Sequence, residues 1–183
     1  MFGLQDRFAV EADVYTISAG NVLGHICLWA ANQRIGVYEQ NVLLQTPALF
    51  FREFLDRRGW RNHFTLEAKP KTEVLRIVDW ALYSDGEQSQ EEHLYLPYRE
   101  FAPDYQRCEV CPRLSPSFDG SLAVLLEYQH TARFIWRACE ATETLETFLR
   151  LGECQAAMRG FVDFVGAAEL GILGDSGVPP SSS

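Results

Sequence analysis

The fold is decided by residues 118–165, FDGSLAVLLEYQHTARFIWRACEATETLETFLRLGECQAAMRGFVDFV. From residue 122 to 128, Leu, Val, Leu and Tyr recur at every second position, which is the period that a pleated strand imposes. A second alternation covers residues 134–139 after the polar turn QHTA, and residues 144–149 supply a third strand. The stretch therefore predicts a three-stranded antiparallel meander.

A helix is predicted to follow the meander. Gly152 ends the third strand, and apolar residues then recur at i, i+4, i+7, i+8 and i+11, the spacing of one helix face. The residues on this stripe are Cys154, Met158, Phe161, Val162 and Val165. We expect this helix to lie on one face of the meander and to complete the folding core.

The N-terminal part of the chain is predicted to form further strands. Residues 8–17 alternate apolar with polar side chains, and residues 23–29 and 35–38 are typical of a hairpin. Gly24 and Gly36 lie inside the hairpin strands, where glycine indicates a bulge or a close approach of another backbone.

Two helices are predicted between the hairpin and the meander. Thr46 suits an N-cap with Pro47 in the first turn, and Gly59 ends this helix. The second helix follows Pro70 and stops at Asp85. The predicted fold is thus α+β: a mainly antiparallel twisted sheet, made of the hairpin and the C-terminal meander, with two central helices and one C-terminal helix.

The domain organisation is predicted to be simple. A chain of 183 residues can bury one core, so we expect a single domain over residues 1–165. Residues 166–183 have lost all periodicity and are predicted to be a flexible tail. No apolar run reaches the roughly 18–20 residues of a membrane span, and the N-terminus does not resemble a signal peptide, which favours the cytoplasm.

The charge balance restricts the partners. Twenty-five acidic residues against sixteen basic ones give a net charge of −9. Binding to nucleic acid depends on Lys and Arg contacts to phosphates, so this composition argues against a nucleic-acid partner. It suits a protein whose partner is basic.

The five cysteines favour reduced thiols over disulfides, because their number is odd and no signal peptide precedes them. Cys27, Cys139 and Cys154 lie at apolar-patterned positions and are predicted to be core residues. Cys108 and Cys111 could provide two zinc ligands, but a structural site needs two more. We interpret this pair as loop thiols without a role and predict no metal and no cofactor, with a zinc site as the alternative.

Catalytic motifs are absent from the sequence. The four histidines are scattered, and there is no HExxH, no Gly-x-Ser-x-Gly elbow and no phosphate-binding glycine loop. The chain is therefore predicted not to be an enzyme, and no catalytic residue is assigned.

One segment has the composition of a protein-binding surface. Between residues 85 and 105, an acidic loop precedes a segment rich in aromatic side chains that also contains carboxylates, a combination that suits contact with a basic protein. The predicted partner-binding residues are Asp85, Glu87, Glu91, Glu92, Tyr95, Tyr98, Glu100 and Asp104. The alternative is that the tyrosines cap the core while the carboxylates keep the loop solvated.

The succession of these features resembles a known group of proteins. A Trp-bearing hairpin, LGHICLWAANQRIGVYE at residues 23–39, precedes the FDG turn at Phe118. Arg133 and Trp136 then share a strand, and Gly152 leads into the closing helix. This order resembles the small α+β immunity proteins encoded beside bacterial polymorphic and contact-dependent toxins, in particular the family numbered forty-two, over roughly residues 15–165.

The resemblance implies an antitoxin that acts in bacterial competition. Such a protein binds one cognate toxin in the cytoplasm and neutralises it by steric and electrostatic blocking. The carboxylates would then pair with basic residues of the toxin. Two alternatives remain open: a general protein-interaction module without a toxin partner, and a small zinc-binding protein or enzyme.

Overall fold

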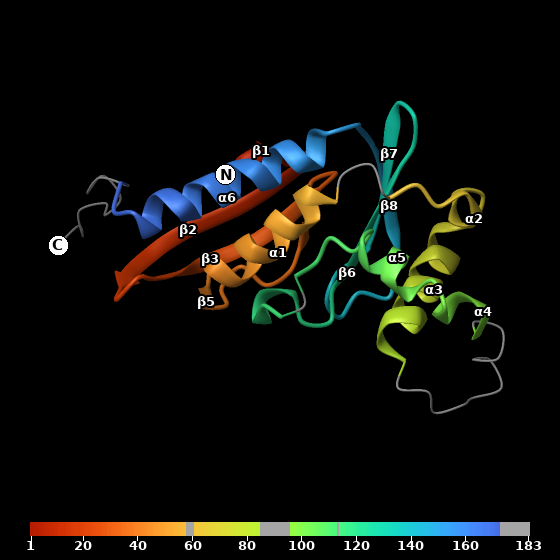
Figure 1. The fold of residues 1–183 in the computed structure, drawn as a ribbon, viewed down its shortest axis with the longest axis horizontal. Coiled ribbons are helices and arrows are strands. Elements are labelled where there is room, and N and C mark those ends of the chain that lie inside the picture. The colour runs from red at the N-terminus through yellow and green to blue at the C-terminus, as the bar shows by residue number, and fades with distance from the viewer. Residues whose placement is uncertain (58–60, 85–95, 113, 173–183) are drawn as a thin grey trace.

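In the computed structural model the fold consists of two antiparallel sheets and several helices (Figure 1). The structure describes residues 1–57, 61–84, 96–112 and 114–172. The predicted α+β class is confirmed. The hairpin and the meander, which the sequence prediction placed in one sheet, form two separate sheets.

The first sheet is built from the N-terminal strands. These are β1 (Phe2–Leu4), β2 (Phe8–Ser18), β3 (Asn21–Ala30), β4 (Gln33–Ile35) and β5 (Val42–Leu43). Their order is β1-β2-β3-β4, and β5 also pairs with β3. The alternation of β2 and β3 places one set of side chains on the core and leaves the other set on an outer face.

The second sheet is the predicted meander. Its strands are β6 (Leu122–Glu127), β7 (Thr131–Arg137) and β8 (Leu145–Arg150), in the order β6-β7-β8. Residues 108–110 extend this sheet beyond β6, because Val110 N donates to Ala123 O and Leu125 N donates to Cys108 O, both at 2.8 Å. The strand β6 is buried along its whole length.

The helices connect and cover the two sheets. They are α1 (Gln45–Asp56), α2 (Phe64–Glu67), α3 (Lys71–Tyr83), α4 (Leu96–Arg99), α5 (Ala102–Gln106) and α6 (Glu153–Glu169), with a 3-10 turn at Pro116–Phe118. The short α2, α4 and α5 were not predicted. One face of the second sheet packs on α3, where Val74 and Val78 meet Val124 and Ile135 in a second hydrophobic cluster.

The predicted N-cap of α1 at Thr46 is wrong. The helix begins at Gln45, and its N-cap, Leu44, makes no side-chain cap hydrogen bond. Gln45 is held instead by the β2–β3 turn: its Oε1 accepts from Val22 N at 3.1 Å and its Nε2 donates to Gly20 O at 2.7 Å. The tertiary contact with the hairpin thus outweighs the local capping signal of Thr46-Pro47.

The predicted position of α6 on the meander is also wrong for most of the helix. It runs along β1 and β2 and beside α1 (Figure 1). The Phe161 ring lies 5.7 Å from Phe51 of α1 and 6.3 Å from Phe2 of β1, measured between centroids. The first turn of α6 meets the meander, where the Gln155 side-chain amide donates to the Glu127 carboxylate.

The helix α6 also extends beyond the predicted domain boundary at Val165. It continues to Glu169, because the apolar stripe carries on through Ala168, which is fully buried. The predicted tail therefore starts inside the helix, and its last part, residues 173–183, lies outside the described residues. No helix of the described chain is both long and apolar enough to cross a bilayer.

Both hairpin glycines make the close backbone approaches that their positions indicated. A Cβ on Gly24 would lie 1.9 Å from Asp13 O, beside the irregularity in the β2–β3 register between Val14 and Thr16. A Cβ on Gly36 would lie 2.6 Å from Ser117 O, and Gly36 has a φ of +93°. The backbone of Gly36 thus packs directly on the 3-10 turn before β6.

The change Gly36→Ala is expected to destabilise the protein, and Gly20→Ala is its matched control. Both glycines have positive φ, so alanine costs about 1–2 kcal/mol at either position. At Gly36 the methyl group also collides with Ser117 O, whereas at Gly20 nothing lies within 4 Å. Urea unfolding should show a larger loss of unfolding free energy for Gly36→Ala than for Gly20→Ala. Equal losses would contradict the close packing of Gly36 against Ser117.

Candidate functional site

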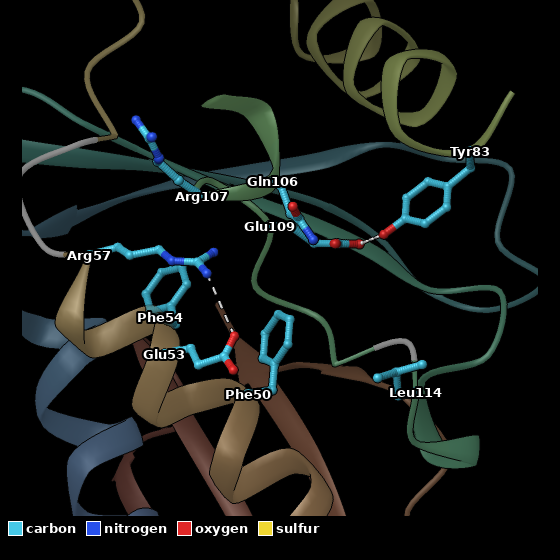
Figure 2. Close-up of a pocket in the computed structure, with 9 residues that line it drawn as sticks. All are labelled: Phe50, Glu53, Phe54, Arg57, Tyr83, Gln106, Arg107, Glu109 and Leu114. Carbon is cyan, nitrogen blue, oxygen red and sulfur yellow. Dashed lines mark hydrogen bonds and ion pairs between the residues drawn. The ribbon is translucent and has the colours of Figure 1, made fainter. Parts of the chain in front are cut away.

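A cleft of about 320 Å³ opens between α1, the end of α3 and the segment that follows α5 (Figure 2). The residues that line it are Phe50, Glu53, Phe54, Arg57, Tyr83, Gln106, Arg107, Glu109 and Leu114. They come from segments up to sixty-four residues apart in the chain, so the tertiary fold alone creates the cleft.

One wall of the cleft is a single face of α1. Phe50, Glu53, Phe54 and Arg57 follow one another at i, i+3, i+4 and i+7, so they project from the same side of the helix (Figure 2). Glu53 and Arg57 form an exposed i, i+4 ion pair at 3.6 Å. Such exposed pairs contribute little stability, and their charges remain accessible to a partner.

The opposite wall places a carboxylate against an aromatic ring. The Tyr83 hydroxyl, at the end of α3, donates to the buried carboxylate of Glu109 (Figure 2). Arg107, directly after α5, is paired with Asp104 at 2.9 Å. Leu114 stands at the rim and is 87% exposed.

A buried arginine contacts residues of both walls of the cleft. Arg61 is fully buried and donates to two backbone carbonyls: that of Phe54 in α1 and, at 2.9 Å, that of Arg107 after α5. Its guanidinium stacks on the Phe54 ring at 3.6 Å from the centroid. Burial lowers the pKa of Arg61, and the neighbouring Glu127 carboxylate opposes that effect.

The Arg61 network extends to the second sheet and to α6. Arg61 Nη1 donates to Glu127 Oε2 of β6 at 3.2 Å, and the other oxygen of Glu127 accepts from Gln155 of α6. Every partner in this chain of contacts comes from a different element. The network therefore fixes the relative position of α1, β6, α6 and the end of α5, and with it the shape of the cleft.

The chemistry that the cleft offers is suited to binding. It presents aromatic surface, exposed charges of both signs and one apolar side chain at the rim. This is the composition found where a protein contacts another protein, with aromatic residues and arginine enriched. Within the described ranges, no three His, Cys, Asp or Glu side chains converge as metal ligands.

Among the described residues of the predicted partner-binding segment, Asp104 contacts the cleft through its ion pair with Arg107. Glu100 is exposed after α4, and Asp104 lies in α5, where it holds the cleft residue Arg107. Tyr98 of α4 is half-buried against the second hydrophobic cluster, with Lys69 Nζ 5.8 Å from its ring. The remaining predicted residues, Asp85, Glu87, Glu91, Glu92 and Tyr95, lie outside the described residues.

The two interpretations of the aromatic side chains in this segment apply to different residues. Tyr105 is fully buried in the second cluster, and burial raises its pKa to about 12. It caps the core, as the alternative reading of the sequence proposed. Phe101 is 42% exposed and is available on the surface.

The Cys108–Cys111 segment has a structural position that the sequence did not indicate. Both thiols are buried, Cys108 in the second hydrophobic cluster and Cys111 in the main one. Burial raises the pKa of the Cys108 thiol to about 12. The segment thus passes between the two clusters at the edge of β6, and its thiols serve as small core residues.

Sequence reasoning missed the cleft as a whole. The spacing of Glu53 and Arg57 was a visible signal of one exposed helix face, although it gave no partner for that face. Nothing in the local sequence could connect Tyr83 with Glu109, because their contact depends on how α3 packs against the second sheet.

Two sheets closed by a C-terminal helix, with a cleft between α1 and the segment after α5 and a net charge of −9, define a small acidic α+β domain. A model of the family Immunity protein 42 matches residues 1–164, so the chain belongs to this family of immunity proteins. The resemblance noted in the hairpin, the FDG turn and the closing helix is thereby confirmed.

A comparison of structures agrees on the fold. The chain is similar to the crystal structure of CdiI from Burkholderia dolosa AUO158, with a TM-score of 0.67 and 17% sequence identity. The similarity covers 89% of this chain and 98% of that one. No curated protein sequence matches the chain.

Proposed function

We propose that this protein binds one cognate bacterial toxin in the cytoplasm and neutralises it by direct, non-catalytic contact. The observation that carries the proposal is the match to an immunity-protein family over residues 1–164, from β1 into α6. The similarity to CdiI, whose fold this chain shares, supports the same role.

Inhibition would be steric and electrostatic. The net charge of −9 suits a toxin with a basic surface, such as a domain that acts on nucleic acids or nucleotides. Carboxylates of the segment from residue 85 to 104 would pair with the cations that the toxin uses on its substrate. The cleft borders this segment through Asp104 and Arg107, and it could receive a side chain of the toxin.

The test of the proposal is protection of cells. The toxic domain encoded next to this protein's gene is expressed with and without the protein, and the purified pair is analysed for a complex. We expect growth to be restored and a one-to-one complex to form. A stable complex with some other protein, without protection from any neighbouring toxin, would instead favour a general interaction module.

Reversing two charges in the predicted segment should slow toxin capture. With Glu91 and Glu92 both changed to Lys, the attraction to a basic toxin falls, and the association rate should drop about ten-fold or more at low salt. The rate can be followed by surface plasmon resonance across a salt series. Thermal melting should be unchanged, and an association rate equal to that of the wild type at low salt would remove these residues from the contact.

A further inference from the structure

The outer face of the N-terminal sheet carries a second cluster of aromatic and acidic side chains. In the β2–β3 register Glu11 lies opposite Cys27, and Asp13 lies opposite His25, on the side away from α1 and α6. Tyr15 follows on β2, and Tyr38 reaches the same cluster from the loop after β4. We call the set formed by Glu11, Asp13, Tyr15, His25, Trp29 and Tyr38 the sheet-face cluster.

The side chains of the sheet-face cluster hold one another in fixed positions. Asp13 Oδ1 accepts from both the backbone N and the ring Nδ1 of His25, at 3.1 Å and 2.9 Å. The His25 ring contacts both Tyr15 and Tyr38, with centroids 5.4 Å and 5.5 Å away and ring planes tilted by 36° and 42°. The imidazole thus joins the two tyrosines in one aromatic cluster.

The remaining members of the cluster are also held by hydrogen bonds. The indole Nε1 of Trp29 donates to Glu11 Oε2 at 2.7 Å. The neighbouring Asn41 Oδ1 lies 3.0 Å from His25 Nε2, and burial together with the charge of Asp13 raises the pKa of Tyr38 to about 12. The Tyr38 hydroxyl is protonated at physiological pH, as tyrosine ordinarily is, and can donate a hydrogen bond to the Asp13 carboxylate.

The sheet-face cluster remains accessible to a partner. Tyr15 is 50% exposed, and the side chain of Asp13 is 52% exposed. The helices α1 and α6 pack on the opposite face of the sheet, where Val10, Ile26 and Leu28 enter the main hydrophobic cluster. Rigid aromatic side chains that need no reordering on binding are typical anchors of protein interfaces.

The charges of this face select the partner. The carboxylates of Glu11 and Asp13 lie among the rings, and the nearby cation, Arg34, is already paired with Glu39 at 3.3 Å. A second copy of this acidic chain would place like charges against each other. A Lys or Arg of a basic protein could instead pair with Asp13 and stack on the exposed Tyr15 ring.

We propose that the sheet-face cluster is the anchoring surface for a basic patch of the cognate toxin. This inference rests on the proposed function, because its occupant is the same toxin. The two predicted surfaces then differ in their kinetic roles: the acidic segment around Glu91 raises the rate of encounter, whereas the preorganised rings on the sheet slow dissociation.

The experiment measures dissociation of the purified toxic domain from the full-length protein. In Tyr15→Ala and, separately, Asp13→Lys, we expect the dissociation rate to rise about thirty-fold, the effect of losing an interface hot spot. The matched controls are Phe148→Ala, an exposed aromatic residue on β8, and Asp163→Lys, an exposed carboxylate on α6. Both controls should dissociate at the wild-type rate.

Each outcome separates this inference from the function on which it rests. If the wild type neither binds nor protects, the proposed function fails. If the wild type binds and protects while Tyr15→Ala and Asp13→Lys dissociate at its rate, the sheet face is not the anchor. If the protein alone self-associates and Asp13→Lys abolishes this, the face belongs to a second copy and the inference is overturned. Melting curves of all variants ensure that a faster dissociation reflects lost contact and not lost fold.

Discussion

Replacing Glu127 with alanine is expected to lower the free energy of unfolding by about 3–5 kcal/mol, the cost of leaving a buried charge without its partner. Glu127 accepts hydrogen bonds from Arg61 and from Gln155, and both donors are buried. The variant would leave the Arg61 guanidinium in the core without a counter-charge. The carbonyls of Phe54 and Arg107 would still accept hydrogen bonds from Arg61, but they carry no net charge and cannot neutralise its guanidinium.

Chemical denaturation of three variants tests this expectation. Glu127→Ala should show the full loss, whereas Arg61→Met combined with Glu127→Leu should recover most of it, because the double variant removes both charges and restores apolar packing. Glu39→Ala breaks the exposed pair with Arg34 and should cost less than about 1 kcal/mol. If Glu127→Ala loses no more unfolding free energy than Glu39→Ala, the buried Arg61 network does not stabilise the packing of α1, β6 and α6.

Trp136→Ala should cost a similar amount, about 3–5 kcal/mol, through the cavity that it creates. Trp136 is 1% exposed and belongs to the main hydrophobic cluster, with its ring 5.4 Å from that of Phe134. In the meander it lies opposite Ala123 on one side and Leu145 on the other, two smaller residues that cannot fill its volume.

The control is Trp136→Phe. Within the described part of the chain, the buried Nε1 of Trp136 has no hydrogen-bond partner, so phenylalanine removes an unsatisfied donor along with some volume. We expect the loss in Trp136→Phe to be well below that in Trp136→Ala. Thermal melting and a protection assay below the melting temperature should be compared for Trp136→Ala: retained protection at low temperature would confirm that the residue supports the fold and not the contact.

The sequence predicted those elements whose signal is local. The pattern after Leu122 predicted the meander because six or seven residues are enough to identify a strand, although β6 itself is buried on both faces and not on one. The stripe from Cys154 to Val165 specified α6 for the same reason, at the helical period. Gly24 and Gly36 indicated close backbone approach, since any larger residue there would collide with another strand or turn.

The pairing of elements was beyond local signals. The apolar stripe of α6 fits any apolar surface, so periodicity could not tell whether the helix covers the meander or the N-terminal sheet. Arg61 and Glu127 are sixty-six residues apart, and no local sequence pattern indicates that they form an ion pair. Of the surface residues, Asp13 and His25 could have been connected from the hairpin register, whereas the cleft depends on where the fold places α1, the end of α3 and the segment after α5.

The course of α6 along β1 and β2 has a consequence for synthesis of the protein on the ribosome. The strands of the first sheet are translated early. The helix that covers their apolar face, α6, is among the last parts to be translated. Until then Phe2, Phe8 and Phe51 lack the neighbours that they have in the native state, and such nascent apolar surface invites aggregation or chaperones. The sheet-face cluster, although encoded in the first forty residues, therefore rests on a stable sheet only after the whole domain has left the ribosome.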